Sequence, residues 1–228
     1  MQVQNSGFIF SDDPRDNDFA FAEKIKGGSR PPINQKEWWS DGWWGSQGAT
    51  PHCCAYSWVH ILEDGPVVQD ALVGRPVPMF PPAKFFEQCK LIDGLPENAQ
   101  GTTIRAGANV AKRLGLISEY RWAKTVDEIV DALIIFGPVI AGTIWRSDMN
   151  AGPDGIMRNS GKSYGGHAYV INGVDIDKQT FRIKNSYGKK WGKNGYGFLS
   201  FKDMEDLLKE GGTICVPFEK KLTNIPKL

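Results

Sequence analysis

Histidine and cysteine are scarce in this chain, which has three histidines and four cysteines among 228 residues. A zinc site needs four nitrogen or sulfur ligands that converge on one point, and these usually come as two spaced pairs. Here such residues lie side by side at His52, Cys53 and Cys54, and adjacent side chains point in different directions. No C-x-x-C pair occurs, which excludes a thioredoxin-like redox motif. We therefore predict no metal and no cofactor.

Blocks of like charge and long apolar segments are also missing. The formal net charge is +1 and the basic residues are scattered, so we expect no nucleic-acid partner. The longest apolar run, around 129–145, is interrupted by Asp131, Gly137, Pro138 and Gly142, and is too short to span a membrane. The N-terminus shows no secretory signal.

These absences favour a cytoplasmic or other intracellular location, where the cysteines stay reduced. Association with a virion is left open, and nothing in the sequence predicts an oligomeric state. Cys89 and Cys215 stand alone in apolar surroundings, so we interpret both as buried structural thiols.

The residues that are present divide the chain into a helical front and a strand-rich rear. Residues from about 1 to 45 are rich in Gly, Pro, Asp and Trp and are predicted to be mostly extended. Four tryptophans, at positions 38, 39, 43 and 44, are interpreted as packing anchors. Apolar spacing predicts helices over 53–64, 82–91, 103–114 and 126–136, and alternation predicts strands within 139–145, 167–177, 180–188, 195–201 and 211–219.

This order predicts an α+β fold in one domain, residues 1–228. We expect a helical lobe at about 46–136 and a β lobe at about 137–218. A cleft between two such lobes is where a ligand would bind.

The segment QGATPHCCAYSW, residues 47–58, holds the candidate nucleophile. Cys53 stands at the predicted helix start, where free N–H groups and the helix dipole favour a thiolate. Cys54 would be rotated by about 100° toward the packed face of the helix. His52 diverges from Cys53, and His60 lies roughly 10 Å further along the helix axis, too far to act as its base.

The remaining histidine, His167, opens a predicted strand, and the glycines before it, Gly165 and Gly166, allow backbone or substrate to approach closely. Asn185 could accept a hydrogen bond from the imidazole and fix its tautomer. The Cys53 N–H and the Gln47 side-chain amide could stabilise a tetrahedral oxyanion, each donor contributing about 3 kcal/mol. Each of these residues taken alone has a purely structural interpretation.

In order, these motifs resemble the papain-like cysteine peptidases, peptidase family C1. The matching elements are Gln-Gly, then Cys-x-Ala-aromatic-Ser, then Gly-Gly-His-Ala, then Asn-Ser-aromatic-Gly followed by Trp-Gly. Further similarity, at DPRDNDF, QGTTIRAGANVAKRLGLISEYRW and YGFLSFKDMEDLL, is to compact bacterial and phage-type members and extends from about residue 10 to 215. Four motifs in order are far more specific than one.

The resemblance implies a two-lobe fold with a helical N-terminal lobe and an antiparallel, β-barrel-like C-terminal lobe. It also implies roles for individual residues. Cys53 matches the nucleophile, since its interval from Gln47 is the family's. His167 matches the base, Asn185 the orienting residue and Gln47 the oxyanion donor.

Three more residues are predicted to contact substrate or shield the site. Gly101 matches a glycine that offers backbone groups to an extended substrate, and Gly166 lies beside the base. Tyr187 stands where the family usually has Trp and would cover the Asn–His hydrogen bond. Cys54 likewise replaces Trp, and Thr50 replaces a disulfide cysteine. We expect no counterpart of the family's long propeptide, because residues 1–35 are too short to be one, although they could cover the cleft. Whether residues 1–45 act as an inhibitory or cleaved segment is left open.

We therefore predict a cysteine peptidase that cleaves peptide or protein substrates through an acyl-enzyme. Two alternatives remain. One is a peptide- or protein-binding module with weak or lost catalysis, because a fold does not fix a function. The other is a thiol acyltransferase, isopeptidase or amidase, because every step up to the thioester is the same.

Overall fold

A computed structural model describes residues 7–11, 13–38, 43–67, 78, 80–222 and 228. Its longer helices are α2 (Cys53–Asp64), α3 (Pro82–Asp93), α4 (Ile104–Arg113), α5 (Val126–Ile135) and α6 (Phe201–Lys209). Short helical segments are η1 (Pro14–Phe19), α1 (Ala22–Ile25) and η3 (Ser147–Met149). The strands are β1 (Gln35–Glu37), β2 (Ile117–Ala123), β3 (Val139–Arg146), β4 (Ser163–Asp175), β5 (Thr180–Lys184), β6 (Tyr196–Ser200) and β7 (Thr213–Glu219).

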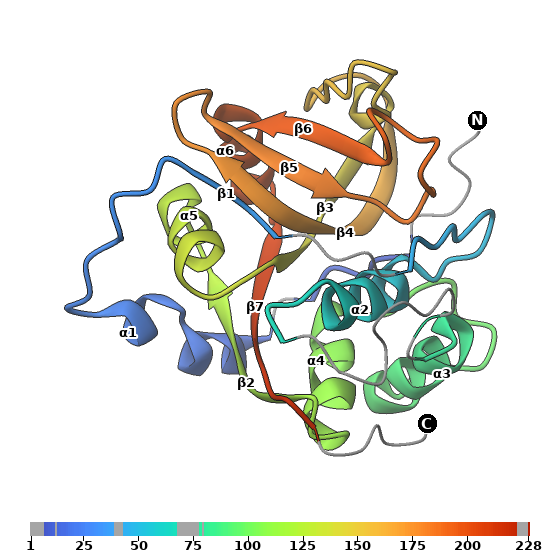
Figure 1. Cartoon of the computed structure of the whole chain (residues 1–228). Helices are drawn as coiled ribbons and strands as arrows, with labels where there is room; N and C mark the ends of the chain where they lie inside the picture. Colours follow the sequence, from blue (N-terminus) through green and yellow to red (C-terminus); the bar gives the residue numbers. More distant parts are fainter. Residues whose placement is uncertain (1–6, 12, 39–42, 68–77, 79, 223–227) are drawn as a thin grey trace.

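The strands form one antiparallel sheet with the order β2-β7-β3-β4-β5-β6, and β1 pairs with β4. Figure 1 shows β3 to β6 above the helices α2, α3 and α4, while β2 and β7 run down beside α4. The predicted fold class, a helical N-terminal region with an antiparallel sheet, is confirmed. The sheet is open rather than closed into a barrel, because β2 and β6 end the described path without pairing.

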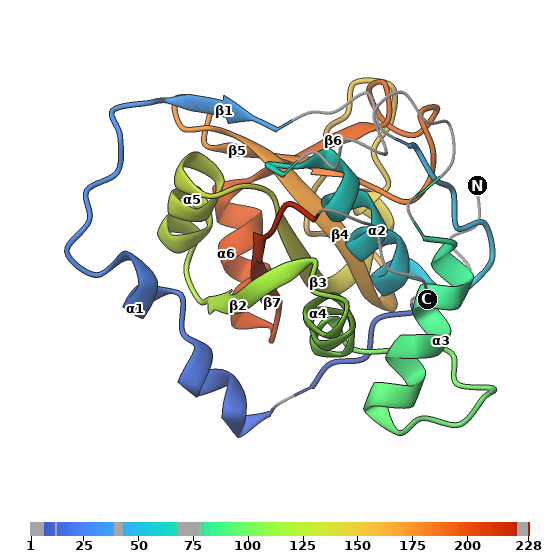
Figure 2. The same cartoon turned by 60° about the horizontal axis from the view of Figure 1, so that its bottom comes forward.

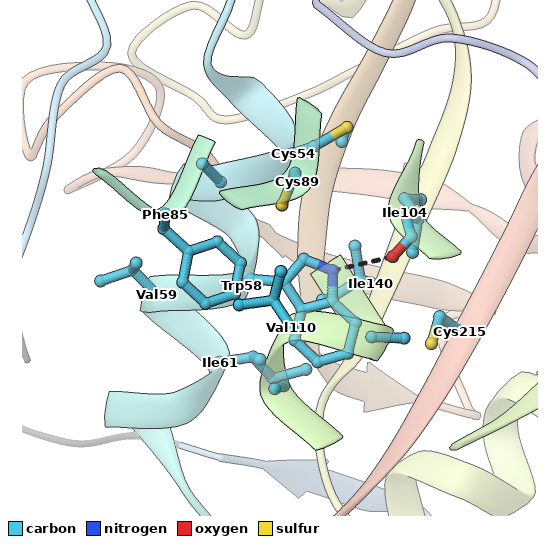
Figure 3. Close-up of a cluster of buried hydrophobic side chains, with 14 of the residues drawn as sticks. Cys54, Trp58, Val59, Ile61, Phe85, Cys89, Ile104, Val110, Ile140 and Cys215 are labelled. Atoms are coloured by element: carbon cyan, nitrogen blue, oxygen red, sulfur yellow. Dashed lines mark hydrogen bonds between the residues drawn. The ribbon is translucent and has the colours of Figure 1, made fainter. Parts of the chain in front are cut away.

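One hydrophobic core lies among α2, α3 and α4. Trp58, fully buried on α2, is at its centre, and its Nε1–H donates to the Ile104 carbonyl at 3.1 Å (Figure 3). Cys54, Cys89 and Cys215 belong to the same cluster, and all four cysteines are free. The prediction that Cys89 and Cys215 are buried structural thiols is therefore confirmed.

A second core lies between the sheet and the helices α5 and α6 (Figure 2). Thr125 caps α5 by accepting from the N–H of Glu128, and Ser200 caps α6 by accepting from the N–H of Asp203. Capping satisfies backbone donors that have no partner within the helix. These two helices fix the position of β3 and β4, which lead into the candidate site.

The structure contains elements that sequence periodicity did not predict. The strand β2 and the helix α6 were missed, and the predicted strand over 195–201 ends where α6 begins. The N-terminal part, predicted as mostly extended, includes η1 and α1. Trp38, Trp43 and Trp44 pack as predicted against Leu133, Tyr56 and Tyr196, whereas Trp39 lies outside the described residues.

In the parts of the chain described, none of the helices combines the length and apolar character that crossing a bilayer requires.

Candidate active site

The predicted site residues come from three separate elements. Cys53 is the first residue of α2, His167 lies on β4 and Asn185 directly follows β5. Because β4 and β5 pair in antiparallel register, with Val170 opposite Lys184, the start of β4 meets the end of β5. The pairing thereby places His167 beside Asn185.

His167 and Asn185 share a hydrogen bond of 2.9 Å between Nε2 and Oδ1. Since an amide oxygen only accepts, Nε2 carries the proton and donates it. Asn185 Oδ1 also accepts the backbone N–H of Ser186 at 2.8 Å, which fixes the direction of the amide. Both side chains are buried, His167 being 1% exposed.

Two aromatic rings enclose the imidazole. Tyr187 stacks on His167 with ring centroids 5.3 Å apart and an angle of 24° between the planes. Trp145, on β3, meets His167 edge-on at 4.6 Å and also contacts Tyr187. The rings keep water away from the His167–Asn185 hydrogen bond, which strengthens it. Tyr187 is thus placed to shield this bond rather than to extend toward a ligand.

The thiol of Cys53 is subject to opposing influences. Burial alone would raise the pKa of this thiol. Hydrogen bonds with Cys54 and His167 and the nearby imidazole charge together outweigh burial, so the pKa lies well below its usual value. The Cys54 sulfur lies 3.2 Å from the Thr102 carbonyl oxygen, so its single S–H can donate there instead of to Cys53. His167 is then the partner that stabilises a thiolate at Cys53. Because Nε2 is bonded to Asn185, Nδ1 is the nitrogen available to Cys53.

Gln47 is held rigidly on the loop before α2. Its backbone N–H donates to the Ser186 carbonyl at 2.8 Å, and its Oε1 accepts from the Ser186 hydroxyl. Its Nε2 donates one hydrogen to the Thr50 carbonyl at 2.7 Å. An amide nitrogen has two hydrogens, so one donor of Gln47 stays available for a ligand.

Cys54, His60 and His52 also lie in this region, but their contacts are structural. Burial raises the pKa of the Cys54 thiol well above its usual value, and the side chain lies in the core as predicted. His60 accepts the N–H of Gly45 at 3.1 Å, so it is a neutral acceptor inside the protein. His52 precedes α2 and packs on the ring of Phe86 at 4.4 Å, which gives this residue, unplaced from sequence, a packing role.

The predicted substrate contacts Gly101 and Gly166 lie in the same region, but both face the N-terminal part of the chain. A Cβ added at Gly101 would lie 2.7 Å from the Gly7 carbonyl oxygen, and one at Gly166 would lie 2.4 Å from that of Phe8. The backbone near these two glycines is therefore already in contact with residues 7 and 8.

Two contributors were missed from the sequence. Ser186 links Gln47 to Asn185, and Trp145 forms one wall around His167. Ser186 could have been suggested by its place directly after Asn185. Trp145 could not, because it reaches the site through the pairing of β3 with β4, where it stands opposite Gly165. In the described ranges no group of three or more His, Cys, Asp or Glu is suited to hold a metal ion.

A helical region packs against an antiparallel sheet, with a cysteine at a helix start near a histidine–asparagine pair, and this is the arrangement expected for a papain-like fold. The structure is similar to that of xylellain, a cysteine protease from Xylella fastidiosa, with a TM-score of 0.73 and 16% identity over 97% of this chain and 99% of that one. It is also similar to the digestive procathepsin L 3 of Tenebrio molitor, with a TM-score of 0.62 and 13% identity over 95% and 75% of the two chains. At these identities the likeness concerns the fold.

Sequence comparisons give matches to proteins of the same kind. The model of the papain family cysteine proteases matches residues 97–207. An uncharacterized peptidase C1-like protein of Acanthamoeba polyphaga mimivirus is 39% identical over 77 residues, which is 32% of this chain and 24% of that protein. The match thus spans about a quarter of the viral protein's length. The chain is thus similar to the papain family of cysteine proteases in sequence over residues 97–207 and in fold over nearly its whole length.

Proposed function

We propose that the chain is a peptidase that cleaves peptide bonds in peptide or protein substrates by nucleophilic catalysis at Cys53. The observation that supports this most directly is the arrangement of His167, which is hydrogen-bonded at Nε2 to Asn185 and lies near enough to Cys53 to help lower the pKa of its thiol. A base held in one tautomer beside a thiol with a lowered pKa has the geometry needed for acyl transfer.

In the first half of the reaction, the Cys53 thiolate attacks the carbonyl carbon of the scissile bond. A C–S bond forms and the carbonyl electron pair moves to oxygen. The free Nε2 hydrogen of Gln47 and the backbone N–H of Cys53 stabilise this oxyanion. As the C–N bond breaks, His167 gives its Nδ1 proton to the leaving amine, and a thioester remains on Cys53.

In the second half, His167 takes a proton from a water molecule, which attacks the thioester. Collapse of the second tetrahedral intermediate breaks the C–S bond and releases the carboxylic acid product. The thiolate and the protonated imidazole are restored. Asn185 acts through His167 as a positioning residue, since its oxygen keeps Nδ1 directed at the sulfur.

The test is turnover of a mixed peptide library by wild type, Cys53→Ala and Cys89→Ala. Cys53→Ala removes the only atom that can form the thioester, so we expect hydrolysis to vanish while the thermal unfolding curve is kept. Cys89→Ala changes a buried thiol outside the site and is expected to retain activity. Equal turnover by Cys53→Ala and wild type would refute the proposal.

Addition of an amine nucleophile to the same assay separates hydrolysis from acyl transfer. A peptidase gives mainly free carboxylic acid, whereas a transferase gives mainly the new amide, since both react from one thioester. If folded wild-type protein binds peptides but leaves every one intact under all conditions, a binding module replaces the proposed enzyme.

A further inference from the structure

Residues 45–47 are called the oxyanion loop below, because they end in the proposed oxyanion donor, and they pair with the chain that follows β5. The N–H of Gln47 donates to the Ser186 carbonyl at 2.8 Å. At the other end of the loop, the Gly45 carbonyl accepts the N–H of Gly188 at 3.1 Å. These backbone bonds fix the spacing of the two segments, but they do not set the position of the loop against α2. That position requires contacts between the loop and the helix.

Two side chains of α2 supply these contacts. The Nε2 atom of His60 accepts the N–H of Gly45 at 3.1 Å. One turn earlier, the hydroxyl of Tyr56 donates to the Ser46 carbonyl at 3.0 Å. Residues four apart lie on one face of a helix, so both side chains reach the same stretch of backbone. Two successive residues of the oxyanion loop are thus attached to two successive turns of α2.

The same helix carries the proposed nucleophile. The helix α2 begins at Cys53, and His60 lies seven residues later, close to two turns, so both project from nearly the same face. About 10 Å of helix axis separates the two residues. Because α2 is one continuous and largely buried helix, the bond from Gly45 to His60 ties the oxyanion loop to the element that positions the sulfur. The side-chain amide of Gln47 is positioned in this way relative to Cys53.

The contact between His60 and the loop is closely fitted. A Cβ added at Gly45 would lie 2.1 Å from the ring of Trp43 and 2.6 Å from that of Tyr56. Both rings also pack on the imidazole of His60, with centroid distances of 5.0 Å for Trp43 and 6.2 Å for Tyr56. The imidazole is 1% exposed and Gly45 is buried. Without the imidazole, the Gly45 N–H would therefore lose its acceptor inside the protein, which is costly.

The charges near His60 favour its neutral form. Since Nε2 accepts a hydrogen bond, the neutral ring carries its proton on Nδ1. The Lys184 amine at the end of β5 lies near this ring and binds both carboxylate oxygens of Asp64, at 2.6 and 2.8 Å. Burial and the Lys184 charge hold the pKa of the imidazole well below its usual range. The ring is thus kept in the form that can accept from Gly45.

We propose that His60, assisted by Tyr56, is a positioning residue for the reaction, which holds the oxyanion loop so that the amide of Gln47 keeps its place beside Cys53. This role rests on the peptidase function proposed above. The imidazole of His60 contacts no substrate and transfers no proton, and it acts only through the backbone of Gly45. The position of the loop matters in the steps that form an oxyanion, but not in the ionisation of the thiol.

The test compares kcat and KM on a peptide with the rate at which iodoacetamide alkylates Cys53, the alkylated residue being identified by tandem mass spectrometry. Alkylation requires the thiolate but forms no oxyanion, so it reports on Cys53 and His167 without the loop. For His60→Ala we expect kcat to fall about tenfold, a part of the roughly 100-fold effect of losing a whole oxyanion donor. We expect KM and the alkylation rate to stay within about twofold of wild type.

Two further substitutions separate the hydrogen bonds from the bulk of the rings. A glutamine amide reaches about as far from the backbone as Nε2 of histidine, so His60→Gln should restore most of the kcat lost in His60→Ala. Tyr56→Phe removes only the hydroxyl that binds Ser46 and should lower kcat about threefold. Val59→Ala is the matched control, since it truncates a fully buried side chain of the same helix within the core of α2, α3 and α4. It should lower the melting temperature and keep the kcat of wild type.

Unchanged kcat in folded His60→Ala would overturn the positioning role. An equal fall in kcat and in alkylation would overturn it too, because a residue that only stabilises the fold affects both rates. Thermal unfolding identifies any variant that fails to fold. If His60→Ala is lost in this way, Tyr56→Phe decides: a lower kcat with unchanged alkylation supports the role, and unchanged kcat overturns it.

A separate outcome concerns the proposed function itself. If Cys53 is alkylated but wild type hydrolyses no peptide, the peptidase function fails, and hydrogen–deuterium exchange tests the hold on the loop alone. The backbone amides of Gly45 and Gln47 should then exchange faster in His60→Ala than in wild type, while the amides in the middle of α2 stay protected. Equal exchange in the two proteins would overturn the hold of His60 on the loop as well.

Discussion

Asn185 is the residue on which the geometry of the site depends most. Its Oδ1 accepts from both His167 and the Ser186 backbone, and Ser186 in turn holds Gln47. One amide oxygen therefore links the proposed base to the proposed oxyanion donor. Because this oxygen is buried between the imidazole and the backbone of the next residue, it has little freedom to move.

Removal of this amide tests its positioning role. For Asn185→Ala we expect kcat to fall about 10- to 100-fold, the loss of a hydrogen bond to a charged group, with KM little changed. The pH dependence of kcat/KM should also shift, because the imidazole loses the partner that orients it. A purely structural role would instead lower the melting temperature and leave the pH profile of the remaining activity as in wild type.

At the scale of single elements, the end of β7 carries an unusual carboxyl group. Burial, with a smaller contribution from the charge of Asp64, raises the pKa of Glu219 from 4.5 to about 8. Its Oε2 accepts the N–H of Val67 at 3.1 Å, while Oε1 has no hydrogen-bond partner among the described residues. The carboxyl group is thus neutral in the folded protein near pH 7.

The raised pKa makes stability depend on pH. Between pH 4.5 and about 8 the folded protein keeps a proton that the unfolded chain releases, so stability falls as the pH rises through this window. For Glu219→Gln, which mimics the neutral form, we expect no gain near pH 4.5 and a gain of about 1–3 kcal/mol at pH 8. Denaturant-induced unfolding of wild type and Glu219→Gln at both pH values measures this change in the free energy of unfolding.

A matched control is Glu23→Gln on α1, where the carboxylate is exposed. This substitution should change the free energy of unfolding little at either pH. A difference between Glu219→Gln and wild type that is the same at both pH values would contradict the assignment of a buried, neutral carboxyl group.

Local sequence signals predicted some elements well and others not at all. The helix α2 begins at Cys53 as predicted, and Thr125 caps α5. The strand β2 was missed because its partner β7 lies almost a hundred residues later in the chain, so no local pattern reveals the pairing. The helix α6 follows β6 without a break, and Ser200 with Asp203 was a capping signal that could have been used.

At the scale of the whole molecule, the candidate site lies where the two hydrophobic cores meet. Cys53 belongs to the core of α2, α3 and α4, whereas Trp145 and Tyr187 belong to the core of the sheet. Spacing and family resemblance identified Cys53 and Tyr187 from the sequence, but not Trp145. The contacts of residues 7 and 9 with Thr102 could not be predicted in this way, because they join backbone groups and involve no distinctive side chain.

The most direct measurement of the central claim is the location of the adduct formed by a peptidyl epoxide that reacts with thiolates. Wild type and Cys89→Ala should each take up one inhibitor molecule, which tandem mass spectrometry should place on Cys53, and Cys53→Ala should take up none. An adduct on Cys54, or no adduct in either folded protein after long incubation, would contradict the assignment of Cys53 as the nucleophile.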